Sequence, residues 1–99
     1  MMDGSTFEGA KALSHRERDD AYFRLIYAKG DWRVIACKDN LQWIIQRAEK
    51  RRGQREWTGN SYCSTRKALT RLWHAKTGDV HGMIELSKML SERIGGEGA

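Results

Sequence analysis

Residues 32–47 read WRVIACKDNLQWIIQR, two runs of alternating side chains on either side of a turn-forming pair. Every second residue of the first run is apolar and shares one face of a predicted strand: Trp32, Val34 and Ala36. The second run places a matching set on one face: Leu41, Trp43 and Ile45. Asp39 and Asn40 lie between the runs, and both tolerate the backbone of a tight turn. The pattern predicts an antiparallel pair of strands.

Residues on both sides of this pair extend the predicted sheet. Aromatic and β-branched side chains fill residues 22–28, YFRLIYA, and Gly30 follows at a position suited to a tight turn. Three strands joined by two tight turns form an antiparallel meander. A short fourth strand is predicted over residues 56–63, where Gly59 and Asn60 can form a bulge or a turn.

Two helices are predicted after the sheet. Ser64 or Thr65 caps the first helix, and its apolar stripe consists of Ala68, Leu69, Leu72 and Trp73. Gly78 ends this helix and Asp79 caps the second, whose shared apolar face consists of Met83, Leu86, Leu90 and Ile94. Gly95 and Gly96 end the second helix. We expect Trp73 to pack against the sheet face that carries Trp32 or Trp43.

The predicted fold class is therefore α+β: a small antiparallel meander of three to four strands, followed by two C-terminal helices packed on one face. A chain of 99 residues, with 39% apolar and 31% charged residues, has room for one modest core. We expect a partly ordered N-terminal arm over residues 1–20, a single α+β domain over 21–94 and a flexible tail over 95–99.

Positive charge is concentrated in the middle of the chain. Residues 29–76 hold twelve basic and four acidic residues, a net charge of +8, whereas the rest of the chain carries −3. This asymmetry is typical of a surface that binds a polyanion. The candidate contact residues lie in a predicted loop over residues 48–55, on the first helix and in the strands: Arg33, Arg47, Lys50, Arg51, Arg52, Arg55, Arg66, Lys67 and Arg71.

Two other interpretations of this charge remain open at this point. An exposed run of cations can be a solvated face with no partner, or it can contact an acidic protein surface. Arginine outnumbers lysine in the predicted loop, which favours forked contacts with phosphate or carboxylate groups.

Other features of the chain indicate no catalytic or metal chemistry. Cys37 and Cys63 lie far apart and without short ligand spacing, so we expect reduced thiols and no zinc site. His15, His74 and His81 are scattered along the chain. No apolar run approaches the roughly 18 residues of a membrane span. We expect a cytoplasmic protein without cofactor, metal or membrane contact; its oligomeric state stays open.

Several stretches carry a resemblance to known proteins. Over Tyr22–Leu69, with Trp32–Leu69 as the main part, the chain resembles a group of short uncharacterised bacterial and phage-type proteins; that group supplies no activity to carry over. Three strands followed by a helix are also similar to the sheet-reading DNA-binding domains of ethylene-response factors and to recombinase arm-binding domains. That likeness implies a sheet inserted into the major groove, with Arg33, Gln42 and Gln46 on its exposed face.

These observations predict a small non-enzymatic binding module. Its basic loop and helix face would contact nucleic acid or a nucleoprotein. The alternative is a protein inhibitor of a host defence complex, encoded by a mobile element and similar to anti-CRISPR proteins, that acts by protein–protein contact. A third hypothesis rests on Asp31–Val34 and the Arg-rich strand end that follows, which are similar to ribonuclease toxins of the RelE type.

Overall fold

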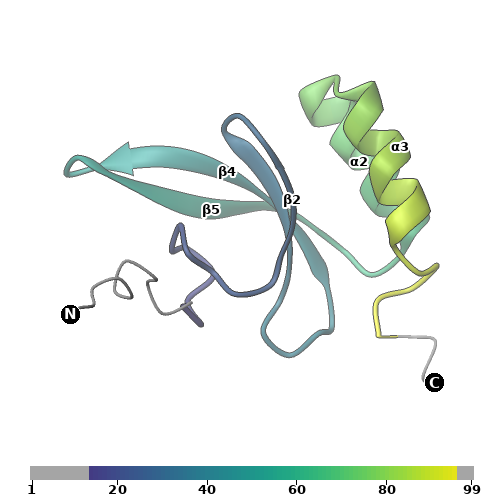
Figure 1. Cartoon of the computed structure of the whole chain (residues 1–99), viewed down its shortest axis with the longest axis horizontal. Coiled ribbons are helices and arrows are strands. Elements are labelled where there is room, and N and C mark those ends of the chain that lie inside the picture. The colour runs from purple at the N-terminus through teal and green to yellow at the C-terminus, as the bar shows by residue number, and fades with distance from the viewer. Residues whose placement is uncertain (1–13, 96–99) are drawn as a thin grey trace, which may run out of the picture.

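The computed structural model describes residues 14–95 and has the predicted α+β architecture (Figure 1). Four antiparallel strands form one sheet in chain order: β2 (Leu25–Lys29), β3 (Trp32–Ala36), β4 (Trp43–Arg51) and β5 (Gln54–Cys63). Two helices follow: α2 (Arg66–Thr77) and α3 (Val80–Met89). The meander and the two C-terminal helices are thus confirmed.

Tight turns join the strands, and each has a residue with a left-handed backbone. Gly30 has a φ of 60° between β2 and β3, and Asn40 has a φ of 58° between β3 and β4. The turn between β4 and β5 consists of Arg52 and Gly53, with φ angles of 54° and 77°. The predicted loop over residues 48–55 is therefore wrong, because a two-residue turn lets both strands continue through this basic stretch.

One face of the sheet and both helices enclose the larger core. Its buried residues come from three strands and two helices: Val34, Ala36, Trp43, Ile45, Cys63, Leu69, Trp73 and Leu86. Trp73 is fully buried, and the ring of Tyr27 meets it edge to face with 5.7 Å between centroids. The predicted contact of Trp73 with the sheet is confirmed. Leu41 is 68% exposed, since β4 begins only at Trp43.

The opposite face of the sheet is covered by the segment that precedes β2. Ile35 and Ile44 form a second buried cluster there with Tyr22, whose hydroxyl donates to the carbonyl of Ala36 at 2.8 Å. Ser14 pairs with Tyr22 at the start of this segment. Residues 14–20, which the sequence assigns to the N-terminal arm, are thus in contact with the sheet. The rest of that arm, and residues 96–99 of the predicted tail, lie outside the described residues.

Local caps define both helices. The side chain of Thr65 accepts from the amide of Ala68 at 3.2 Å, and Gly78 ends α2 with a φ of 70°. α3 ends at Met89, five residues before the predicted Ile94. The chain becomes extended there, and the amide of Ile94 donates to the carbonyl of Ser64 at 3.1 Å. Pairing with the segment before α2 thus replaces the last predicted helical turn.

A buried carboxylate joins the two helices to the sheet edge. Asp79, the cap of α3, accepts from the amide of Gly82 at 3.0 Å and from the indole nitrogen of Trp73 at 3.2 Å. Its carboxylate also lies 3.5 Å from the ammonium of Lys29. The amide of Gly82, the Trp73 indole and Lys29 lower the pKa of Asp79, against the opposing effect of burial.

Replacing Trp73 with alanine should lower the free energy of unfolding by about 3–5 kcal/mol, because the change removes a fully buried ring and leaves a cavity. Urea denaturation followed by circular dichroism measures the loss. His74→Ala changes the exposed neighbour on the same helix and should stay within about 0.5 kcal/mol of the wild type. A Trp73→Ala protein with wild-type stability would contradict the described core.

Replacing Asp79 with asparagine keeps a good helix cap but removes the charge, so it should cost about 1 kcal/mol at pH 7. The folded pKa of Asp79 lies below its unfolded value, so the charge stabilises the fold above the ordinary aspartate pKa of about 3.9. That contribution is lost as the pH falls below this value. Urea midpoints at pH 7, 5 and 3 should therefore show a gap between variant and wild type that closes with acid. A gap of constant size would contradict this role.

Candidate nucleic-acid interface

The pairing of β4 with β5 continues beyond the rest of the sheet. β3 follows β4 only as far as the pair Trp32–Arg47, whereas β4 and β5 stay paired to Arg51 and Gln54. Residues 47–58 form a two-stranded projection, the ribbon arm, which points away from the helices (Figure 1). It holds five basic and two acidic residues, a net charge of +3. The basic residues are all exposed: Arg47, Lys50, Arg51, Arg52 and Arg55.

Like charges face each other across the ribbon arm. Glu49 lies opposite Glu56, and the guanidinium of Arg51 reaches their carboxylates at 3.4 and 3.7 Å. Lys50 lies opposite Arg55 at the neighbouring position of the ribbon. Directly opposed like charges destabilise a pair of strands. Arg51 offsets the repulsion between the two glutamates, whereas Lys50 and Arg55 are opposed cations that folding of the arm alone does not favour.

The tip of the arm places an arginine where arginine is rare. Arg52 has a φ of 54°, at a turn position where Asn, Asp and Gly prevail. Its side chain is exposed, and none of the ion pairs within residues 14–95 involves it. The tip thus presents a cation to solvent that has no ionic role in the described structure.

The side chains of two arginines connect the arm to the rest of the sheet. The guanidinium of Arg47 lies 5.5 Å from the ring centroid of Trp32. Arg55 donates to the carbonyl of Gly30 at 2.8 Å and lies 3.8 Å from the carboxylate of Asp20. Arg55 therefore ties the arm to the turn between β2 and β3, and its charge is partly committed within the protein.

The basic residues predicted on the first helix do not join the ribbon arm. Arg66 is half-buried and donates to the carbonyl of Leu90 at 3.0 Å, so it joins the start of α2 to the end of α3. Lys67 and Arg71 are exposed on α2. α2 and the tip of the arm lie at opposite ends of the molecule in Figure 1. The sequence predicts that the basic stretch and the first helix form one surface. In the structure they form two separate surfaces.

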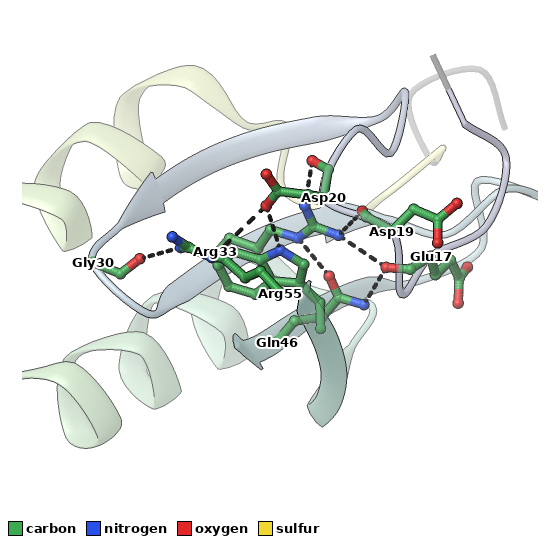
Figure 2. A network of polar contacts seen from close by, with 8 residues as sticks. Glu17, Asp19, Asp20, Gly30, Arg33, Gln46 and Arg55 are labelled. Atoms are coloured by element: carbon green, nitrogen blue, oxygen red, sulfur yellow. Dashed lines mark hydrogen bonds and ion pairs between the residues drawn. The ribbon is translucent and has the colours of Figure 1, made fainter. Parts of the chain in front are cut away.

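The prediction that Arg33 and Gln46 are exposed on the sheet is wrong. Arg33 is 1% exposed and Gln46 is 2% exposed. The guanidinium of Arg33 donates to the side-chain oxygen of Gln46 at 2.7 Å and to three backbone carbonyls of the N-terminal segment (Figure 2). These carbonyls belong to Glu17, Asp19 and Asp20, at 2.9, 2.9 and 3.2 Å. The segment covers this face, which a pattern of alternation alone cannot reveal.

Arg33 stays a cation although it is buried. Burial lowers the pKa of its guanidinium to about 10, and the carboxylate of Asp20 acts in the opposite direction. The indole ring of Trp57 lies beside it, with its centroid 4.3 Å from the guanidinium carbon. Trp57 also donates from its ring nitrogen to the carboxylate of Asp20 at 2.8 Å. Arg33 is therefore an internal anchor, and its guanidinium is not exposed to a partner.

Two arginines beside the arm were missed by sequence reasoning. Arg16 and Arg18 are exposed and lie next to β5, where the amide of Trp57 donates to the carbonyl of Arg18 at 2.9 Å. They line a hollow together with Arg51 of the ribbon arm and Tyr62 of β5. No local pattern marks them, because their position depends on the bonds between Arg33 and the segment that carries them.

Comparisons of the chain with family models, with curated proteins and with solved structures gave no match. Within residues 14–95 no helix is long and apolar enough to cross a membrane. In the same part of the chain no three His, Cys, Asp or Glu side chains are grouped so that they could hold a metal ion.

Replacing Arg33 with lysine should release residues 14–20 from the sheet, because a single ammonium cannot reproduce the forked contacts to three carbonyls. We expect a loss of about 3–5 kcal/mol in the free energy of unfolding. Limited trypsin digestion with mass analysis should show faster cleavage after Arg16 and Arg18. Lys38→Gln, at an exposed turn residue, is the control. Unchanged cleavage in Arg33→Lys would show that Arg33 does not anchor the segment.

Proposed function

We propose that this protein is a small non-enzymatic binding module that contacts nucleic acid through the ribbon arm. The observation that carries the proposal is the form of the basic stretch, residues 47–58: two paired strands that project beyond the sheet with a net charge of +3. A two-stranded ribbon is narrow enough to enter the major groove of a duplex. Its cations can also follow the phosphates of a single strand.

The composition and the contacts of the ribbon arm support a role in binding nucleic acid. Four of its five cations are arginines, whose planar guanidinium forms forked bonds with phosphate oxygens. The backbone of the arm is paired along its length, and the side chain of Arg55 connects the arm to Gly30 and Asp20. A partner therefore meets cations that are already positioned, which lowers the entropic cost of binding.

The same cations could contact a cluster of carboxylates on a protein. This is the mode that a mobile-element inhibitor of the anti-CRISPR type would use, and binding to nucleic-acid probes separates the two partners.

Cys37 and Cys63 are both free thiols, which is compatible with the proposed cytoplasmic location.

Binding should weaken with salt in proportion to the number of phosphate contacts. We expect log affinity to fall with log salt at a slope of about −3 to −4 for the arm, measured by fluorescence anisotropy between about 50 and 200 mM salt. The triple change Lys50→Gln, Arg51→Gln and Arg52→Gln should reduce the steepness of this slope by about 2 to 3. The probes are duplex DNA, single-stranded DNA and RNA.

A charge-matched variant of α2 supplies the control for this prediction. The triple change Lys67→Gln, Arg71→Gln and Lys76→Gln removes the same charge from exposed positions of that helix. The slope should then change by less than about 1. An equal effect of both triple variants would show that net charge, and not the arm, drives binding. In the opposite outcome, no probe binds, and the wild type captures a specific protein that the arm variant does not capture. That result would favour the inhibitor.

A further inference from the structure

A hollow of about 600 Å³ lies beside the ribbon arm, between residues 16–18 and the outer strand β5. Its size falls within the range of sites that hold small molecules or parts of larger ligands. Three features of its lining point to a ligand: an exposed aromatic ring, a rim of arginines and a backbone that is held in place.

The aromatic ring belongs to Tyr62, which is 59% exposed. Tyr62 lies opposite Ile44, and Gly59 lies opposite Gln46, so both residues of β5 are on the same face of the sheet. The phenol extends across Gly59, since a Cβ at that position would lie only 2.8 Å from its Cζ atom. Glycine therefore lets the ring rest on the strand and present its outer surface to solvent.

A β-bulge explains why these two residues meet. Between the pairs Ile45–Ser61 and Gln46–Gly59 the register shifts by one residue, so Asn60 has no partner on β4. A bulge bends a strand and redirects the side chains around it. Here it places the phenol of Tyr62 over the glycine, where both residues line the hollow.

The rim of the hollow carries more positive than negative charge. Three arginines and two glutamates line it: Arg16, Arg18, Arg51, Glu17 and Glu56. Glu56 is already paired with Arg51 at 3.7 Å. Within residues 14–95 no ion pair involves the exposed side chains of Arg16 and Arg18.

The backbone that carries these arginines is fixed. The carbonyl of Glu17 accepts from Arg33 and from the side-chain amide of Gln46, both at 2.9 Å, and the carbonyl of Arg18 accepts from the amide of Trp57 at 2.9 Å. The chain thus holds the backbone of two cations at a constant distance from an exposed aromatic ring.

We propose that the hollow binds an unpaired nucleobase, stacked on Tyr62, while Arg16 and Arg18 contact the phosphates on either side of it. A flat aromatic surface bordered by cations is the arrangement with which proteins bind single strands, because every base has a face that can stack. The inference rests on the proposed function and specifies its substrate as single-stranded or locally unpaired nucleic acid. A base inside a duplex has both faces covered by its neighbours and cannot enter.

Tyr62→Ala tests the stacking directly. With a fluorescein-labelled oligothymidylate, we expect its affinity to fall about 5- to 100-fold at constant salt. Tyr62→Trp and Tyr62→Phe should bind as the wild type does. Tyr62→Leu keeps an apolar cover over Gly59 but lacks an aromatic face, so it should bind as weakly as Tyr62→Ala while retaining the wild-type urea midpoint. Leu41→Ala, at an exposed apolar turn residue, is the control.

An oligomer of the same length whose sugars carry no bases separates stacking from charge. The wild type should bind this abasic strand with the affinity that Tyr62→Ala shows for oligothymidylate, and Tyr62→Ala should bind both strands equally. If Tyr62→Ala loses as much affinity for the abasic strand as for oligothymidylate, the stacking proposal is overturned.

The remaining outcomes distinguish this inference from the proposed function. In one outcome, the triple variant of the ribbon arm lowers the affinity for single strands and Tyr62→Leu leaves it unchanged. That outcome shows that the arm binds nucleic acid and that the base site is wrong. If the duplex binds as tightly as the single strand and depends equally on Tyr62, the base site is also wrong. If no nucleic-acid probe binds, both proposals fail.

Discussion

The buried guanidinium of Arg33 is the interaction on which the arrangement of this protein depends. It joins β3 to the backbone of residues 17–20, where its guanidinium donates to the carbonyls of Glu17, Asp19 and Asp20 and Gln46 donates to that of Glu17 as well. A buried cation is tolerated only when its donors are used, and four of its hydrogen bonds are in place here. Through this anchor the N-terminal segment covers the second face of the sheet, and Asp20 comes within reach of Trp57 and Arg55.

Both faces of the sheet are consequently occupied, and the small chain divides its apolar residues between two clusters. The helical side holds the larger core around Trp73, and the opposite side holds Ile35 and Ile44 under the N-terminal segment. Neither face of the three paired strands β2, β3 and β4 can then enter a DNA groove in the manner of the sheet-reading domains. The ribbon arm continues past the last pair between β3 and β4, and its exposed cations lie outside both cores.

The arm and the hollow at its base form one continuous region. Arg51 belongs to both, and the segment anchored by Arg33 supplies the opposite rim with Arg16 and Arg18. The opposed cations Lys50 and Arg55 and the left-handed backbone at Arg52 both cost stability, and the exposed ring of Tyr62 adds little to the core. Such features gather where a surface serves a partner more than the fold, and they gather here on one side of the molecule.

Local sequence patterns were enough to predict the meander, both helix starts and the side of the sheet that Trp73 covers. Alternating apolar residues, turn residues and helix caps each act over only a few positions of the chain. Most of the candidate cations could also be named from charge alone. Tertiary structure decided the rest: Arg33 is internal because a distant segment supplies its acceptors, and Arg66 is half-buried because the end of α3 lies against it. It also decided that residues 48–51 and 54–55 are strands, and that Tyr62 lines one hollow together with Arg16 and Arg18. These outcomes depend on contacts between residues far apart in the chain, and no pattern within one segment encodes them.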